Sequence, residues 1–226
     1  MVVRVCEEES PRSPVSGVEA TVSGMHTSGA QESPRFVYVP WNDELSIDSR
    51  ASHVFAVARD LASKERLPVM GIAATKDQLP DGWGKFPYRT RKSSVAAIDG
   101  PAVRIYFWPS LDDLASMAPA SSGFVIVLEW QAGELAGWAR HNHALNFDTR
   151  EELVTARSDA AMELYERIER NGNNGWHDDW GTRDAINDMR KLRDLGEFDV
   201  LDLAGYMIGR RGSRAIRQLL QLARGV

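Results

Sequence analysis

Four acidic residues could do chemistry, because each lies beside a segment with the character of a β-strand: Asp43, Asp77, Asp99 and Glu129. Open α/β sheets bind their ligands in a crevice at the carboxyl ends of the strands. Carboxylates placed there can hold a divalent cation or transfer a proton. One hypothesis is therefore an α/β enzyme with a carboxylate site at the strand ends, with Asp99 and Glu129 as candidate catalytic residues.

Asp99 and Glu129 could together hold Mg²⁺ beside a scissile phosphate, the arrangement that metal-dependent nucleases use. Such nucleases place a lysine two residues after the second acid, where this chain has Gln131. A helix is also expected between the two acids. An acid that meets solvent where a strand ends accounts for Glu129 equally simply. An enzyme of the nuclease or nucleotide-processing type is therefore the alternative hypothesis, not the leading one.

Two basic stretches could contact phosphates. The segment 85–92 has two aromatic residues, no acid and four cations: Lys85, Arg89, Arg91 and Lys92. The segment 203–226 has no acid and five arginines: Arg210, Arg211, Arg214, Arg217 and Arg224. Phosphate binding needs cations on one accessible face. The other interpretation is a solvated helix face docked onto the acidic remainder. The leading hypothesis is a binding or adaptor protein whose arginine-bearing helix contacts nucleic acid or an acidic partner.

Oxygen and nitrogen donors are concentrated at His177, Asp178 and Asp179, and Asp184 and Asp188 stand four residues apart on one helix face. No known calcium-loop spacing is present. Acids at the start of a helix are favoured as caps and by the helix dipole, so we expect capping and no metal site. The sequence has no dinucleotide fingerprint, Walker loop or nucleophile elbow, and we expect no cofactor.

The 226 residues carry a net charge of -5, with 43% hydrophobic and 26% charged residues, which is typical of a globular protein. The overall charge gives no reason to expect nucleic acid. The single cysteine, Cys6, excludes a disulfide framework and a cysteine-ligated metal site. No apolar run approaches the roughly 18 residues of a membrane span, and the first residues lack the apolar core of a signal peptide. We expect a soluble, cytoplasmic protein without membrane contact; its oligomeric state is open.

Apolar segments predict strands at residues 35–40, 68–74, 102–108 and 124–130. The uninterrupted run 124–128 indicates a strand covered on both faces. A helix between the first two strands, capped by Ser46 or Asp48, implies a right-handed crossover and a parallel pair. Asp99 and Gly100 suggest a hairpin between residues 95–98 and 102–108. The long loop 75–93 is of a length that is often functional.

The expected fold class is α/β: a mixed, mainly parallel sheet of about five strands with flanking helices and a helical C-terminal subdomain. Residues 1–33 have the composition of a disordered tail. Residues 34–147 form the α/β domain, and residues 148–226 form the helical subdomain. Asp148 and Glu151 are spaced as a capping box for a helix that reaches Arg170. Further helices are expected at about 182–195, 199–209 and 213–224.

Overall fold

The structure, a computed structural model, describes residues 35–95, 98–116 and 123–226. The disordered tail expected at residues 1–33 lies outside these residues. The strands are β1 (Arg35–Val39), β2 (Val69–Ala73), β3 (Tyr88–Arg89), β4 (Ser94–Val95), β5 (Ala102–Phe107), β6 (Gly123–Leu128) and β7 (Leu145–Asn146). The helices are α1 (Ile47–Glu65), α2 (Leu111–Ser116), α3 (Ala136–His141), α4 (Asp159–Asn171), α5 (Asp179–Asp194), α6 (Val200–Met207) and α7 (Ser213–Ala223).

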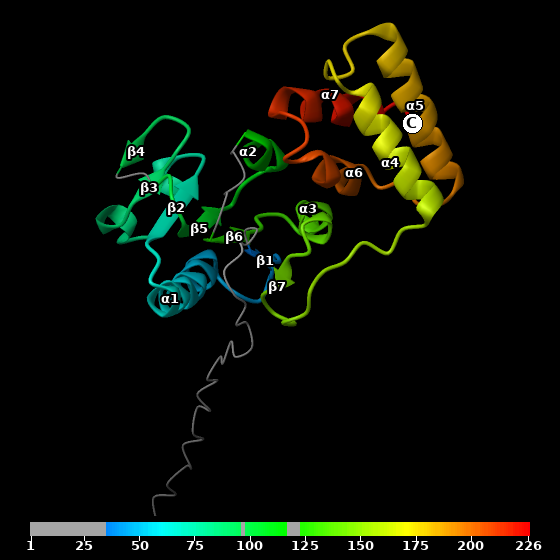
Figure 1. Cartoon of the computed structure of the whole chain (residues 1–226). Helices are drawn as coiled ribbons and strands as arrows, with labels where there is room; N and C mark the ends of the chain where they lie inside the picture. The colour runs from blue at the N-terminus through cyan, green and yellow to red at the C-terminus, as the bar shows by residue number, and fades with distance from the viewer. Residues whose placement is uncertain (1–34, 96–97, 117–122) are drawn as a thin grey trace, which may run out of the picture. The chain divides into compact units, whose positions relative to one another are not determined.

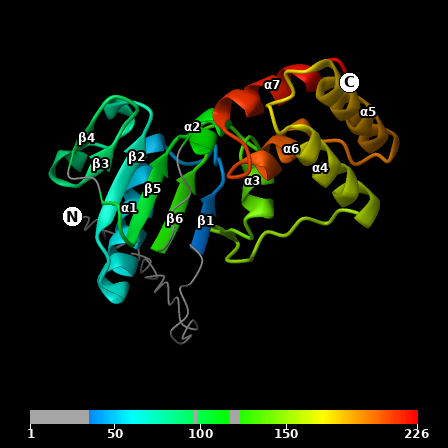
Figure 2. The ribbon, with the colours of Figure 1, turned by 45° about the horizontal axis from the view of Figure 1, so that its top comes forward.

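The strands form one sheet in the order β4-β3-β2-β5-β6-β1-β7. Every neighbouring pair is parallel except β3 and β4, which are antiparallel. Figure 2 shows the long strands β2, β5, β6 and β1 side by side. The α/β fold class with a mixed, mainly parallel sheet is therefore confirmed, and the sheet has more strands than expected.

The expected pairing of the first two strands is wrong. β1 pairs with β6 and β7, and β5 and β6 separate it from β2. The crossover through α1 therefore passes over β6 and β5 before the chain enters β2. β5 and β6 occupy the centre of the sheet, where nearly all of their residues are buried.

The expected hairpin around Asp99 and Gly100 is also wrong. β5 has parallel partners on both edges, β2 and β6, so no edge is left for residues 95–98. β4 pairs instead with β3, across a turn in which the backbone N–H and side-chain hydroxyl of Thr90 both donate to the carbonyl of Ser93. Pro101 has no N–H for a tight hairpin at the predicted position.

Side chains on the two faces of the sheet belong to different hydrophobic clusters. Ile126 of β6 packs in the cluster of α1, whereas Val125 and Val127 belong to the cluster that includes side chains of α2 to α7. All three are buried, which confirms that this strand is covered on both faces. Figure 1 shows α1 on one side of the sheet and α2 and α3 on the other.

The long helix expected from residue 148 begins later, at α4, with Ser158 as its cap. The side chain of Asn146 accepts hydrogen bonds from the backbone N–H groups of Asp148 and Thr149, and Arg150 takes the left-handed conformation, with φ of 63°. The N–H of Asn146 then donates to the carbonyl of Glu151. Residues 146–151 therefore form a turn where the capping box predicted a helix start. A short polar side chain such as that of Asn146 can hydrogen-bond to nearby backbone groups and so favour a non-helical conformation.

The three later helices occur where they were expected, with shifted ends. Asp178 and Asp199 cap α5 and α6 through side-chain hydrogen bonds to backbone N–H groups. Helices α3 and α6 touch at Gly137 and Gly205, where an added Cβ would overlap the backbone of the facing helix. The boundary at residue 147 stays a prediction. No helix within residues 35–95, 98–116 and 123–226 has the length and apolar character needed to cross a membrane.

Candidate functional site

The chain leaves neighbouring strands towards opposite faces at the carboxyl end of the sheet. After β1 it enters α1 on one face, and after the adjacent β6 it enters α3, whose side chains pack in the cluster of the other face. The segment after β2 likewise packs Trp83 on the α1 side, whereas β5 leads to α2 on the other side. Such reversals open a crevice beyond the strand ends, where α/β proteins bind ligands.

A pocket of about 380 Å³ lies at these strand ends. Three parts of the chain build it: the first turn of α1, the loop after β2, and single residues that follow β5 and β6. The lining residues are Ile47, Asp48, Ala51, Asp77, Gln78, Leu79, Pro80, Asp81, Trp108 and Trp130. The volume is within the range of small-molecule sites, which are about 300–1,000 Å³.

Two tryptophans form the aromatic wall of this strand-end pocket. Trp108 is buried, and Trp130 is 49% exposed. Their rings meet edge to face with centroids 5.6 Å apart, and Trp130 makes a similar contact with Trp41 at 5.8 Å. Trp108 has a φ of 54°, a strained conformation for a bulky residue. Such strain persists where the surrounding structure imposes it, and it gathers at functional sites.

Arg50 lies behind this wall with an unused hydrogen-bond donor. Its guanidinium lies over the rings of Trp41, at 4.8 Å, and Trp108, at 5.3 Å, and its Nη2 donates to the carbonyls of Pro40 and Glu129. Its Nη1 is buried and has no hydrogen-bond partner among the described residues. Burial lowers the pKa of Arg50, although the charges of Glu129 and Asp148 oppose that shift. A buried donor of this kind requires water or a ligand.

The acidic side of the pocket comes from the loop after β2, which is fixed at both ends. At its start, the side chain of Gln78 accepts hydrogen bonds from the backbone N–H groups of Ala74 and Thr75. At its end, Trp83 packs against Phe55 and Phe107, with ring centroids 4.6 and 5.0 Å apart. Asp77 and Asp81 lie between these anchors. The segment that the sequence marked only as a long loop is thus a fixed wall of the pocket.

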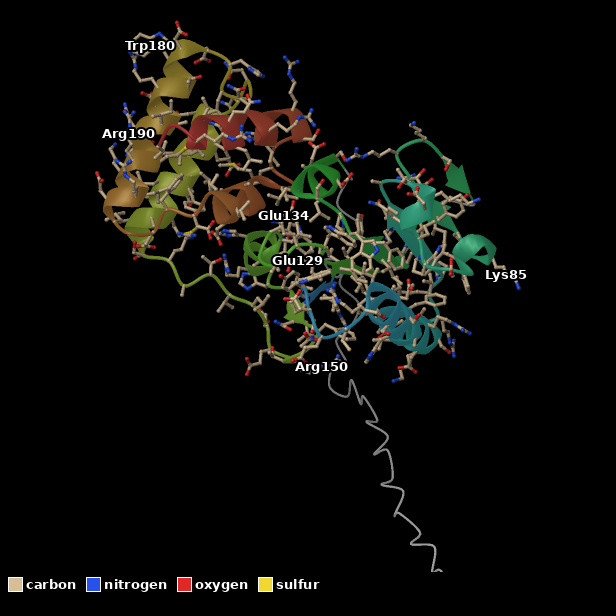
Figure 3. All side chains as sticks on the ribbon, turned by 180° about the vertical axis from the view of Figure 1, so that it is seen from behind. Lys85, Glu129, Glu134, Arg150, Trp180 and Arg190 are labelled. Atoms are coloured by element: carbon tan, nitrogen blue, oxygen red, sulfur yellow. The ribbon has the colours of Figure 1, made fainter. Side chains whose placement is uncertain are left out.

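Glu129 is buried beside the pocket, and its carboxylate is hydrogen-bonded to backbone N–H groups. It accepts hydrogen bonds from the N–H groups of Trp41, at 3.1 Å, and Leu135, at 2.8 Å. Burial raises the pKa of Tyr38, and the charge of Glu129 and its hydrogen bond with Tyr38 raise it further. Burial also raises the pKa of Glu134, helped by the charges of Glu129 and Asp113 and opposed by the N–H of Leu111. Figure 3 shows Glu129 and Glu134 near each other, and Glu134 is half-buried.

The other strand-end acids are dispersed. Asp77 lines the pocket, and Asp43 accepts a hydrogen bond from the indole of Trp41. Asp99 precedes β5 and therefore lies at the amino end of the sheet, where it pairs with Arg89 at 3.6 Å. A strand of six residues spans about 20 Å, so the structure does not bring Asp99 and Glu129 together.

Most of the arginines of the segment 203–226 contact other parts of the chain. Arg211 donates to the carbonyl of Glu169 and to Asn173, and Arg210 lies 3.7 Å from the Glu169 carboxylate. Arg217 pairs with Asp112 at 2.5 Å. Arg214 and Arg224 are exposed, with no ion pair to any residue that the structure describes.

The cations of the basic segment 85–92 lie in different surroundings. Arg91 pairs with Asp113 of α2 through Nη2 at 2.5 Å, and Lys92 is exposed. Figure 3 shows Lys85 across the sheet from α7. Arg217 of α7 pairs with the neighbouring Asp112, so residues of both basic stretches contact α2. Whether either binds nucleic acid or an acidic partner stays a prediction.

Two of the residues considered for a metal serve other roles. Asp178 caps α5, and hydrogen bonds from the N–H of Gly181 and from Asn174 lower its pKa. Asp188 is buried and pairs with Arg167 and Lys191. His177, Asp179 and Asp184 are exposed. Within the part of the chain that the structure describes, no three His, Cys, Asp or Glu side chains gather as metal ligands do.

The structure contains a buried charge network that the sequence did not indicate. Asp202 of α6 is fully buried and accepts hydrogen bonds from Arg140 at 2.5 Å, Arg157 at 2.6 Å, His141 at 2.9 Å and Tyr165 at 3.1 Å. Burial alone would raise the pKa of Asp202, but these hydrogen bonds and charges hold it well below its ordinary value. Since both oxygens of Asp202 accept hydrogen bonds from several elements, the network joins α3, α4 and α6.

The sequence did not mark four polar or aromatic pocket residues, nor Arg50 behind the pocket wall; the four are Asp48, Asp81, Trp108 and Trp130. One signal could have found the two tryptophans: each lies within two residues of the end of an apolar strand, Trp108 after β5 and Trp130 after β6. No family model, curated protein or solved structure matches this chain. The fold and the pocket are therefore the basis for a function.

Proposed function

We propose that the protein is a binding protein whose ligand is a small molecule held in the strand-end pocket. The observation that carries this proposal is the position of the pocket: it lies beyond the carboxyl ends of parallel strands, where the chain leaves neighbouring strands towards opposite faces. The same strand ends were considered for the enzyme hypothesis. The proposed role is still binding, as in the leading hypothesis, but the binding site is now the pocket and not the arginine-bearing helix.

Exposed apolar side chains support the same location. Six large apolar residues are exposed in the described part of the chain. Two of them, Ile47 and Trp130, line the pocket, and a third, Leu45, is two residues from Ile47 in the sequence. Apolar side chains that gather on a surface around a hollow mark ligand or partner sites, whereas isolated ones need no explanation.

We place binding before catalysis because the carboxylate expected to react is already engaged. Glu129 accepts hydrogen bonds from two backbone amides, which is what a carboxylate with a structural role does. A general acid or base must be within hydrogen-bond reach of the substrate proton. Of the acids considered for catalysis, only Asp77 lines the pocket.

A fragment screen tests this proposal. Thermal shift would be measured for a library of neutral, cationic and anionic fragments with the wild type, Trp130→Ala and Trp180→Ala. Trp180 is the matched control, because it is 72% exposed on α5 and its ring contacts Arg183. We expect fragments that stabilise the wild type and Trp180→Ala but not Trp130→Ala. A library without such fragments, or hits that persist in Trp130→Ala, would contradict the proposal.

A further inference from the structure

The walls of the strand-end pocket carry net negative charge. Asp48, Asp77 and Asp81 line it, and no lysine or arginine is among the ten lining residues. These three carboxylates have no ion-pair partner within residues 35–95, 98–116 and 123–226. The pocket and its indole wall define the site, and the carboxylates determine which charge it favours.

Two sources of positive potential oppose these carboxylates, and both are smaller. The N-terminus of α1 reaches the pocket, but a helix dipole amounts to only about half a positive charge there, against three full negative charges. Arg50 is the nearest buried cation, but the charges of Glu129 and Asp148 lie close enough to act on it. The negative charge of the pocket walls therefore prevails.

The aromatic wall favours the same kind of ligand. The indole of tryptophan is the best ring for attracting a cation over its face. Arg50 already lies over Trp108, which shows that this cluster accepts a cation, and half of the Trp130 surface is still open. Leu79, Pro80 and Ile47 add apolar surface beside the rings. An organic cation with a flat or apolar body would match both the rings and the carboxylates.

We infer that the ligand of the pocket is a small organic cation, an amine or related group attached to a flat apolar body. This inference rests on the proposed function and adds the chemical class of its ligand. It disfavours nucleotides and other phosphates, because the lining residues offer no cationic side chain to pair with phosphate. Their binding would also bring negative charge towards three unpaired carboxylates.

A series of three probes of similar size and different charge tests this inference: 2-phenylethylamine, 2-phenylethanol and 3-phenylpropionate. Binding would be followed by tryptophan emission up to about 10 mM, since a first fragment binds in the millimolar range. We expect the amine to bind best and the carboxylate worst. Added salt should weaken binding of the amine, because exposed charges are screened, and should leave the affinity for the alcohol unchanged.

Charge-removing variants of the same size locate the effect. Asp77→Asn and Asp81→Asn should each lower the affinity for the amine about two- to fivefold, a range typical of one exposed ion pair. Neither variant should change the affinity for the alcohol. Asp184→Asn, an exposed acid on α5, is the matched control and should change neither. An alcohol or carboxylate that binds as well as the amine, or an amine insensitive to Asp77→Asn and Asp81→Asn, overturns the inference while the fragment screen still supports the pocket. Absence of binding by all three probes also overturns it, and the fragment screen then decides the proposed function separately.

Discussion

The rings of Trp108 and Trp130 meet edge to face, 5.6 Å apart, although 21 residues separate them in the sequence. The contact follows from the sheet: β5 and β6 are neighbours, and their last residues, Phe107 and Leu128, are paired in register. The residues that follow two such strands emerge at the same edge. The aromatic wall of the pocket is therefore a direct product of parallel pairing at the centre of the sheet.

Asp202→Asn should lower the free energy of unfolding, because Arg140 and Arg157 lose the carboxylate of Asp202. Breaking a buried ion pair by removing one partner costs about 3–5 kcal/mol. Chemical denaturation of the variant and of Asp184→Asn as a surface control would measure this. Equal stability of the two variants would show that the Asp202 network contributes little.

The same carboxylate sets a pH dependence. Because the pKa of Asp202 is lowered on folding, its contribution is present above the ordinary value of about 3.9 and is lost as the pH falls through the folded value. The destabilisation of Asp202→Asn should therefore be undiminished from pH 7 to pH 5. A difference that disappears at pH 5 would contradict the assigned direction.

Glu134→Gln should raise the melting temperature at neutral pH. The pKa of Glu134 is raised by burial and by neighbouring carboxylates, so the folded state holds a proton that the unfolded state releases as the pH rises. Glu134 therefore costs stability at pH 7, and glutamine removes that cost while its oxygen can still accept from Leu111. The gain should shrink towards pH 4, and a variant less stable than the wild type at pH 7 would refute it.

The five arginines of the segment 203–226 should differ in their effect on stability. Arg211→Ala should cost about 1 kcal/mol, because it removes hydrogen bonds to Glu169 and Asn173. Arg214→Ala combined with Arg224→Ala should be close to neutral, since both side chains are exposed. Thermal unfolding of the two variants side by side would check this. Equal losses would show that the exposed pair also braces the fold.

The pair Arg214 and Arg224 also provides the test of nucleic-acid binding, the function first expected for this helix. Binding of duplex DNA would be titrated at two salt concentrations. If the helix binds phosphates, replacing both arginines should reduce the salt slope by about 0.9 for each phosphate that the protein no longer neutralises. If the wild-type protein does not bind DNA at about 50 mM salt, the nucleic-acid-binding hypothesis is wrong.

The local parts of the fold could be predicted because neighbouring residues determine them. Ser46 caps α1 as expected, and Ser110 and Asp113, three residues apart, exchange hydrogen bonds in a capping box at α2. The apolar run 124–128 also became a strand buried on both faces. Strand order was missed, because it depends on which edges the remaining chain leaves open.

The sequence anticipated one residue of the proposed pocket and little of its composition. Asp77 lines the pocket at the strand ends, as the position of the acid suggested. The indole wall depends on β5 and β6 being neighbours, which no local spacing reveals. The Asp202 network joins residues 37 to 62 positions apart, and a sequence pattern cannot indicate such a long-range cluster.

Fluorine NMR of the protein labelled with 5-fluorotryptophan tests the central claim most directly. The chain has seven tryptophans, so single substitutions can assign every signal. A stabilising fragment should shift the signals of Trp108 and Trp130 and leave those of Trp176, which is buried among the C-terminal helices, and Trp180 unchanged. Fragments that shift Trp180, or that stabilise the protein without moving Trp108 or Trp130, would contradict a ligand in the strand-end pocket.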